Sequence, residues 1–331
     1  MSASTFHVGR TAVYDRAESV TAPEELHDPC FSSLTAVPKE LVHRTSAAQV
    51  LLTDWQRLDD ARFSVSARWP LSHAFFTPVG DGYYDPLICA ETIRQIAYLL
   101  GHAEFAVPFG HQFVLWDLSV DLVRPERLRV GLAPATVELE ITCVEVKRRA
   151  GRLSGLGYEA VVRRDGQVVA TGRASVTCTS PAVYQRIRPE HVLTPEHHPL
   201  PLTAPAAPQS VARLSPTDVV LSPLGQENRW QLRVDTNHPV LFDHWVDHVP
   251  GMVLMEAARQ AAASTLGRPS FVPLGVAGEF KRYVELDAPC IIESERLYQE
   301  VPGAEEVVRV TGHQNGELTF VGLVTAPSYD C

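Results

Sequence analysis

Two stretches of the chain are apolar at almost every position, residues 86–101 and 251–266. A helix that is apolar on all sides has to be buried, so we expect two long buried helices. In several other segments, apolar or β-branched residues alternate with polar ones, which is typical of strands with one buried face. These segments are 135–149, 154–164, 167–178, 291–301 and 305–314. An Asp-Gly pair at 165–166 and an Asn-Gly pair at 315–316 predict hairpin turns, because both support positive φ angles.

The second half of the chain repeats the first. The motif Glu-x-x-Arg-Gln at 91–95 recurs at 256–260, an offset of 165 residues, and His73 falls on His238 at the same offset. Over the 38 positions aligned around this motif, eight are identical, where chance gives about two. One buried helix wrapped by a curled antiparallel sheet is the hotdog arrangement. We therefore predict an α+β fold made of two tandem hotdog repeats, a double hotdog.

The duplication divides the chain into four parts. We expect an N-terminal arm at 1–35, the first hotdog repeat at 36–178, a linker at 179–210 and the second repeat at 211–331. The linker contains seven prolines. Because proline lacks an amide hydrogen and has a restricted φ, we expect this linker to be extended, without a regular helix or a central strand.

Composition narrows the class of protein. The 331 residues, about two domains in length, carry a net charge of −10, which argues against general nucleic-acid binding. No run of about 18 apolar residues occurs, so we expect no membrane span. The six cysteines are scattered and include no Cys-x-x-Cys pair. This pattern argues against a zinc ribbon and fits the reduced cytoplasm, where we expect the protein to act.

The strongest candidate for a chemical site precedes the second apolar helix. His244 and His248 stand in a loop that runs into a Pro-Gly pair, the expected helix start. The first amide groups of a helix have no intrahelical partner, so they can hold a thioester carbonyl or an anion. Glu256 lies farther along the same apolar helix, and Arg259 lies on nearly the same face. A carboxylate in such a helix is costly unless it is paired or used in chemistry.

Four strings of residues together resemble the A-factor synthase (AfsA) family. They are F-D-H-W-V-D-H-V-P-G-M-V-L-M-E-A-A-R-Q at 242–260, V-H-R-T-S-A-A-Q-V-L-L-T-D-W at 42–55, E-T-I-R-Q at 91–95 and V-P-F-G-H-Q-F-V-L-W-D-L at 107–118. The resemblance covers roughly residues 40–325. It implies a hotdog acyltransferase that passes a β-ketoacyl group from acyl carrier protein to the hydroxyl of dihydroxyacetone phosphate. The ester would lead to a γ-butyrolactone, butenolide or furan signalling molecule. The resemblance implies no metal and no organic cofactor.

Esterification needs a base, an oxyanion site, a phosphate anchor and an acyl tunnel. Either Glu256 or Glu91 is a candidate base, and His244 and His248 are further catalytic candidates. Gly251 is a candidate oxyanion donor. The candidates for substrate binding are Arg259 as the phosphate anchor, Arg94, Gln260, and Phe113 and Trp116 as the wall of the tunnel. We expect direct transfer, because no Gly-x-Ser-x-Gly motif or distinctive cysteine offers a nucleophile.

These motifs also have structural explanations. The two Glu-x-x-Arg pairs fit buried ion pairs between the repeats, and Asp243 and Asp247 fit a role in orienting the neighbouring imidazoles or capping the loop. A dehydratase or thioesterase acting on acyl thioesters is one alternative function, and a non-catalytic protein that binds acyl chains or lactones is another. The sequence leaves open which repeat holds the site, whether both share it, and whether the protein is a monomer or a homodimer.

Binding of a carrier protein poses an electrostatic problem. Carrier proteins are generally acidic and this chain is acidic too, so docking needs a local basic patch. The densest group of positive charge consists of Lys147, Arg148, Arg149 and Arg152. We expect the carrier protein to dock there, and a solvated strand end is the alternative explanation of this group.

Overall fold

The two halves of the chain build the two halves of one antiparallel sheet. The structure is a computed structural model that describes residues 37–189, 199–270, 272–298 and 303–328. In these residues, twelve strands run in the order β1-β2-β4-β5-β6-β3-β9-β12-β11-β10-β8-β7. The order of the last six strands mirrors that of the first six, as a duplication requires. The expected N-terminal arm, residues 1–35, lies outside the described residues.

The strands of the first half are β1 (Leu52–Arg57), β2 (Arg62–Trp69), β3 (Gln112–Leu122), β4 (Ala135–Arg149), β5 (Arg152–Arg164) and β6 (Gln167–Thr179). Those of the second half are β7 (Leu221–Gln226), β8 (Arg229–Leu232), β9 (Gly275–Phe280), β10 (Cys290–Leu297), β11 (Glu306–Gln314) and β12 (Glu317–Ala326). Strands β4, β5, β6, β10 and β11 lie where the alternating pattern predicts them. Both expected hairpin turns are present, with positive φ at Asp165 and Asn315.

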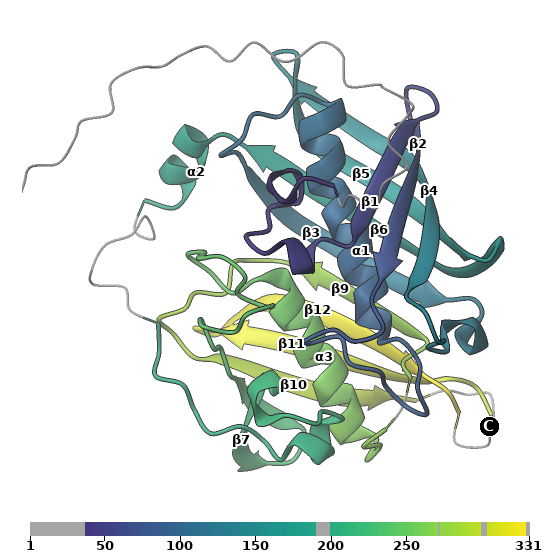
Figure 1. Ribbon diagram of the computed structural model, residues 1–331. Helices are drawn as coiled ribbons and strands as arrows, with labels where there is room; N and C mark the ends of the chain where they lie inside the picture. The colour runs from purple at the N-terminus through teal and green to yellow at the C-terminus, as the bar shows by residue number, and fades with distance from the viewer. Residues whose placement is uncertain (1–36, 190–198, 271, 299–302, 329–331) are drawn as a thin grey trace, which may run out of the picture. The chain divides into compact units, whose positions relative to one another are not determined.

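The two halves meet where β3 pairs with β9. This antiparallel pairing runs from Asp117 opposite Glu279 to Asp121 opposite Gly275, and it makes the sheet continuous across the repeats. The long helices α1 (Pro86–Leu99) and α3 (Gly251–Thr265) each lie against one half of the sheet (Figure 1). The predicted α+β double hotdog is therefore confirmed.

Helix and sheet approach each other closely at equivalent places in the two repeats. A side-chain carbon at Gly172 of β6 would lie 2.6 Å from the Ile93 side chain of α1, and one at Gly322 of β12 would lie 2.8 Å from the Ala258 side chain of α3. Ile93 and Ala258 are 165 residues apart, the offset of the duplication. Glycine at both strand positions therefore allows each buried helix to pack closely against its half of the sheet.

The linker contains a short helix that the sequence did not predict. Helix α2 (Pro181–Ile187) begins directly after β6, and its preceding residue, Ser180, accepts a hydrogen bond from the amide of Val183. The expectation that the prolines exclude a regular helix here is wrong. Pro181 occupies the first turn, where its missing amide hydrogen costs nothing. Residues 190–198 of the linker lie outside the described residues.

Each repeat begins with a short 3-10 turn, and the two turns match. The turn Lys39–Val42 ends at His43 and the turn Pro208–Val211 ends at Ala212, both with positive φ. The arginine that follows each of them, Arg44 or Arg213, is thereby directed toward the helix of its own repeat. In the described part of the chain, no helix is long and apolar enough to cross a membrane.

Candidate active site

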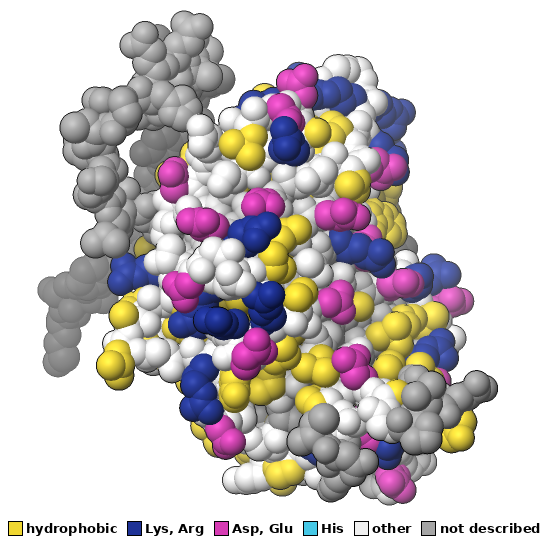
Figure 2. Space-filling view, turned by 90° about the vertical axis from the view of Figure 1, so that its right-hand side faces the viewer, with side chains coloured by type: hydrophobic (Ala, Val, Ile, Leu, Met, Phe, Trp, Pro, Cys, Tyr) yellow, Lys and Arg dark blue, Asp and Glu magenta, His cyan; other side chains and the backbone are white. Residues whose placement is uncertain are grey.

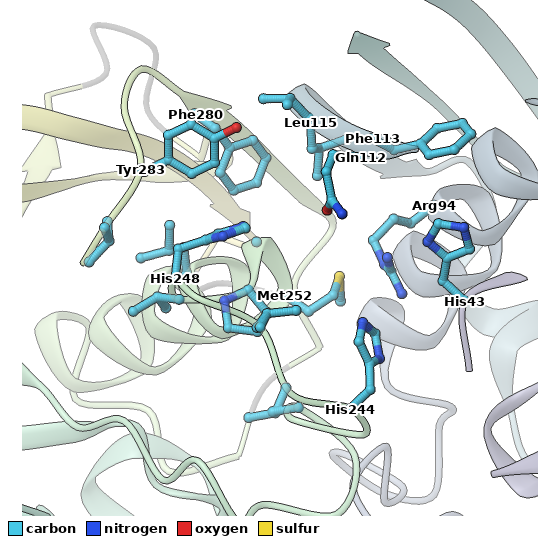
Figure 3. A pocket seen from close by; sticks show the side chains of 18 of the residues that line it. His43, Arg94, Gln112, Phe113, Leu115, His244, His248, Met252, Phe280 and Tyr283 are labelled. Carbon is cyan, nitrogen blue, oxygen red and sulfur yellow. The ribbon is translucent and has the colours of Figure 1, made fainter. Parts of the chain in front are cut away.

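A pocket of about 230 Å³ lies where the start of α3 meets the first repeat. Its wall includes six residues that the sequence analysis proposed, namely Arg94, Phe113, Trp116, His244, His248 and Gly251. Arg94, Phe113 and Trp116 come from the first repeat and the other three from the second. Figure 3 shows Arg94 and Phe113 of the first repeat and His244 and His248 of the second repeat around the cavity. Both repeats therefore line this pocket.

The start of α3 is open toward this pocket. Pro250 precedes the helix, and no side chain of the described residues caps it. Pro250, Gly251 and Met252 all line the cavity. A side-chain carbon at Gly251 would lie 3.2 Å from both Leu115 and Phe280. Glycine thus keeps the cavity wide at the start of the helix, where the first amide groups have no intrahelical partner, an arrangement that suits an oxyanion.

His248 is held in one orientation by Asp247. The ring Nδ1 lies 2.7 Å from an oxygen of Asp247, so Nδ1 carries the proton and Nε2 is left as an acceptor in the neutral ring. Burial alone would raise the pKa of Asp247, but the hydrogen bonds from His248 and Tyr184 and the charge of Arg188 lower it to about 2. Asp247 is therefore ionised, and the pair has the form of an oriented general base.

His244 has a different environment. Its neighbour Asp243 accepts hydrogen bonds from the amides of Thr45 (2.6 Å) and Ser46 (3.3 Å) and lies 3.8 Å from the His244 ring. Asp243 thus ties the loop of the second repeat to the first repeat. Burial, followed by the charges of Arg44 and Arg94, lowers the pKa of His244. Figure 3 shows His244 on the Arg94 side of the pocket, opposite His248.

Arg94 brings positive charge to the pocket wall. It donates to both oxygens of Glu91 (2.8 and 2.9 Å) and to the hydroxyl of Tyr98 (2.7 Å). These bonds use three of its five N–H groups. Arg44 also lines the pocket and binds Glu91 at 2.5 Å. Two guanidinium groups share one carboxylate, so this network keeps an excess positive charge beside the cavity.

Glu91 is the shared hydrogen-bond acceptor of this network. Burial alone would raise its pKa, but the charges and hydrogen bonds of Arg44 and Arg94 lower it to about 2. Gln95 donates to Glu91 as well (2.8 Å), and it also bonds the backbone of Gln49 and Leu51. Such a saturated carboxylate is too weak a base for catalysis. Its surroundings favour the structural explanation of the first Glu-x-x-Arg pair.

The second network is buried away from the cavity. Glu256 accepts two hydrogen bonds from Arg213 (2.7 and 2.6 Å), two from Arg259 (3.0 and 2.7 Å) and one from Gln260 (2.6 Å). The three residues Glu256, Arg259 and Gln260 are fully buried and do not line the pocket. The structure therefore does not bring the expected base and phosphate anchor of the second repeat to this pocket. Their arrangement favours a structural ion-pair network.

The two helix starts explain why the two networks differ. Position 85, directly before α1, holds Asp85, and the equivalent position before α3 is Pro250. Asp85 accepts a hydrogen bond from the Leu87 amide (2.9 Å) and lies 3.5 Å from Arg213. It closes the start of α1 and adds a second acidic group to the network of Arg213. Pro250 does neither, so the start of α3 stays open.

The structure adds His43, which sequence reasoning missed. The Nε2 atoms of His43 and His102 lie 2.7 Å apart, and Nδ1 of His102 lies 2.7 Å from the Val107 carbonyl oxygen. A carbonyl only accepts, so His102 donates from Nδ1 and accepts at Nε2 from His43. This leaves Nδ1 of His43 as an acceptor. Burial, followed by His102 and Arg94, lowers the pKa of His43 to about 3, so the ring is neutral.

The missed residues had a signal in the sequence. His43 and Arg44 both belong to the string at 42–55 that carries part of the family resemblance. The matching string in the second repeat has Ala212 and Arg213 at these positions. The histidine is therefore specific to the side that faces the open pocket, while the arginine is common to both networks.

The expected docking patch lies at the tip of the β4–β5 hairpin. Lys147, Arg148, Arg149 and Arg152 are all exposed there. Lys147 pairs with Gly155, Gly155 with Thr177, and Thr177 with Val114 on the pocket wall. Three strand spacings of about 4.8 Å put the backbone of Lys147 about 14 Å from the pocket wall at Val114. On the face that Figure 2 displays, Lys and Arg are interspersed with Asp and Glu.

Comparisons with known proteins show which family this chain resembles. Residues 28–180 and 194–326 match the model of the A-factor biosynthesis hotdog domain. A protein of Streptomyces virginiae named 2-oxo-3-(phosphooxy)propyl 3-oxoalkanoate synthase is 52% identical over 290 residues, which cover 88% of this chain and 97% of that protein. A protein of the same name from Streptomyces griseus is 42% identical over 291 residues, covering 87% and 94%. A solved 12:0-ACP thioesterase from Umbellularia californica superposes with a TM-score of 0.47 at 10% identity, covering 80% of this chain and 94% of that one.

Proposed function

Since the chain belongs to the A-factor biosynthesis hotdog family, we propose that it is an acyltransferase that joins a β-ketoacyl group to the hydroxyl of dihydroxyacetone phosphate. The name of its relatives denotes this product, an ester between a 3-oxoalkanoate and a phosphorylated propanone. The names of these relatives support the reaction that the sequence resemblance implies. The donor is proposed to be an acyl carrier protein of the cytoplasm, and the ester is proposed to lead to a butenolide or butyrolactone.

One observation carries the proposal for the acceptor. The excess positive charge of Arg44 and Arg94 faces a pocket that also contains an uncapped helix start. A guanidinium group binds phosphate with two parallel donors, and Arg94 has N–H groups left for this purpose. We therefore place the phosphate at Arg94, with His244 beside it. This assignment moves the anchor from Arg259 to its equivalent in the first repeat.

His248 is the proposed base. Nε2 accepts the proton of the acceptor hydroxyl while that oxygen attacks the thioester carbonyl, and a C–O bond forms. The carbonyl oxygen becomes an oxyanion, which the amides of Gly251 and Met252 stabilise. The C–S bond then breaks, and the departing thiolate receives the proton from His248. The lining residues include no cysteine or serine among those described, which supports direct transfer without an acyl-enzyme intermediate.

The acyl chain needs an apolar wall, and the pocket provides one. Leu115, Phe280 and Leu254 line it together with Phe113 and Trp116. Trp116 is half exposed and its Nε1 donates to Thr177 at the outer surface. A pantetheine thioester would thus enter past Trp116, on the side of the sheet where the basic patch lies.

Mass spectrometry tests the reaction. The full chain and its His248→Gln variant are incubated with a β-ketoacyl carrier protein, with and without dihydroxyacetone phosphate. We expect a phosphate ester from the wild type when the acceptor is present, and much less from the variant. Free acid in both reactions would show a thioesterase instead. Absence of turnover together with tight lactone binding would show a non-catalytic binder.

A further inference from the structure

Helix α2 and the residue that follows it place two side chains against the loop that carries His248. Tyr184 lies in the helix, and Arg188 directly follows its last residue, Ile187, with its amide still bonded to the Tyr184 carbonyl oxygen (3.0 Å). The Tyr184 hydroxyl lies 2.8 and 2.9 Å from the two oxygens of Asp247, and Nε of Arg188 lies 3.3 Å from one of them. Both side chains are buried, although their helix belongs to the linker. Asp247 thus receives hydrogen bonds from the linker and from His248.

Arg188 also fixes the other side of this loop. Its two terminal nitrogens donate to the two oxygens of Glu285, each at 2.8 Å. The backbone of His248 pairs with that of Glu285 in an isolated bridge. One guanidinium therefore joins both strands of the bridge that carries His248.

Tyr283 completes this frame. The Arg188 guanidinium lies over its ring at 4.0 Å, and the His248 ring meets the same ring edge-on at 4.8 Å. Tyr184 lines the pocket as well. The imidazole is thus held by a hydrogen bond at Nδ1 and by an aromatic face, and both of these contacts depend on groups that Arg188 touches.

We infer that the linker helix is part of the catalytic machinery, with Tyr184 and Arg188 acting as positioning residues that hold Asp247 and thereby keep His248 in the tautomer with a free Nε2. This inference rests on the proposed function for the role of His248 as base. The working site is then built from three parts of the chain: the first repeat, the second repeat and the segment between them. The low pKa of Asp247 agrees with this arrangement.

Kinetics with a matched control tests the inference. Tyr184→Phe removes one hydroxyl, and Arg188→Gln removes the charge. Arg186→Gln removes the same charge from an exposed position of the same helix. We expect Arg188→Gln to lower kcat by about 10- to 100-fold and Tyr184→Phe by about 3- to 10-fold, since charged hydrogen bonds contribute more than neutral ones. The KM for dihydroxyacetone phosphate should change less than twofold in both, and Arg186→Gln should match the wild type.

Nitrogen NMR of the His248 ring gives a readout that does not depend on activity. The wild type should show a protonated Nδ1 and an unprotonated Nε2, and Tyr184→Phe and Arg188→Gln should show a mixture of tautomers. An unchanged tautomer and unchanged kcat in folded Tyr184→Phe would overturn the positioning role. If the wild type makes no ester while the tautomer responds as expected, the proposed reaction fails and the positioning role of the linker helix stands.

Discussion

Arg94 and Arg259 occupy equivalent positions in the two repeats, 165 residues apart, yet they face different environments. The Arg94 side chain is 13% exposed and lines the pocket, whereas that of Arg259 is 0% exposed. Each binds the glutamate three residues before it. The difference arises at the helix starts, where Asp85 closes one site and Pro250 leaves the other open. In the residues that the structure describes, the duplicated fold thus has an open pocket at Arg94 and a closed, buried network at Arg259.

Replacing each of these two arginines by glutamine should separate an effect on substrate binding from an effect on the stability of the fold. We expect Arg94→Gln to raise the KM for dihydroxyacetone phosphate by about 10- to 100-fold, the loss of a charge-assisted hydrogen bond to phosphate. Arg259→Gln should leave the KM of the folded fraction within about twofold and should lower the midpoint of urea unfolding. Equal effects of the two substitutions on KM would contradict the assignment of the phosphate site.

Removal of the charge of Glu256 should destabilise the protein strongly. Glu256→Gln leaves Arg213 and Arg259 buried without their shared carboxylate, and breaking a buried ion pair from one side costs about 3–5 kcal/mol. Urea unfolding followed by circular dichroism measures this loss. Glu145→Gln is a suitable control, because Glu145 forms an exposed pair with Lys147, and it should change the unfolding free energy by less than about 1 kcal/mol. A similarly small change in Glu256→Gln would mean that the network contributes little.

Acid should destabilise the protein before its carboxylates are protonated. Burial lowers the pKa of His73 to about 4, and its Nδ1 accepts from the amides of Phe75 and Phe76. In the unfolded chain its pKa is about 6.5. The unfolded state therefore binds more protons below that pH, so stability is full above pH 6.5 and falls as pH drops toward 4. We expect His73→Asn, whose amide oxygen can still accept, to show a smaller loss of unfolding free energy between pH 7.5 and 5.0. Equal losses would assign the pH dependence to other groups, with His43 first among them.

A single methyl group at the start of α3 should change the selectivity for the acyl chain. In Gly251→Ala the new carbon meets Leu115 and Phe280 at 3.2 Å, closer than ordinary contact. We expect kcat/KM for long β-ketoacyl donors to fall at least tenfold more than that for acetoacetyl, while the melting temperature changes little. The acetoacetyl donor serves as the control, because both donors are measured with the same variant. A uniform loss for all chain lengths would mean that the methyl group disturbs the oxyanion site at the Gly251 amide and does not narrow the acyl channel.

Charge reversal of the basic patch tests carrier-protein docking. Replacement of Lys147, Arg148 and Arg149 by glutamate should raise the KM for the acyl carrier protein at low salt, because docking of an acidic partner depends on local positive charge. The KM for a small thioester analogue, such as a pantetheine conjugate, should not change. If both constants stay at their wild-type values, the docking surface lies elsewhere.

Particular elements show how far the sequence predicts the fold. Helices α1 and α3 follow from apolar residues on all sides, and strands such as β4 follow from alternation, because each pattern lies within neighbouring residues. Helix α2 was missed because seven residues with proline in the first turn carry no periodic signal. The positioning role that we propose for Tyr184 and Arg188 depends on contacts with a loop about 60 residues later in the chain.

The sequence by itself was enough to identify the duplication, the two buried helices, the family and the histidine loop before α3. Each of these follows from a pattern of neighbouring residues or from a repeated motif. It also indicated that Glu256 and Arg259 pair. The tertiary structure decided which copy of each motif lines the pocket. Arg94 faces the cavity and Arg259 does not, because Asp85 and Arg213 close the second network while Pro250 leaves the first one open. That choice depends on packing between distant segments, and no spacing along the chain encodes it.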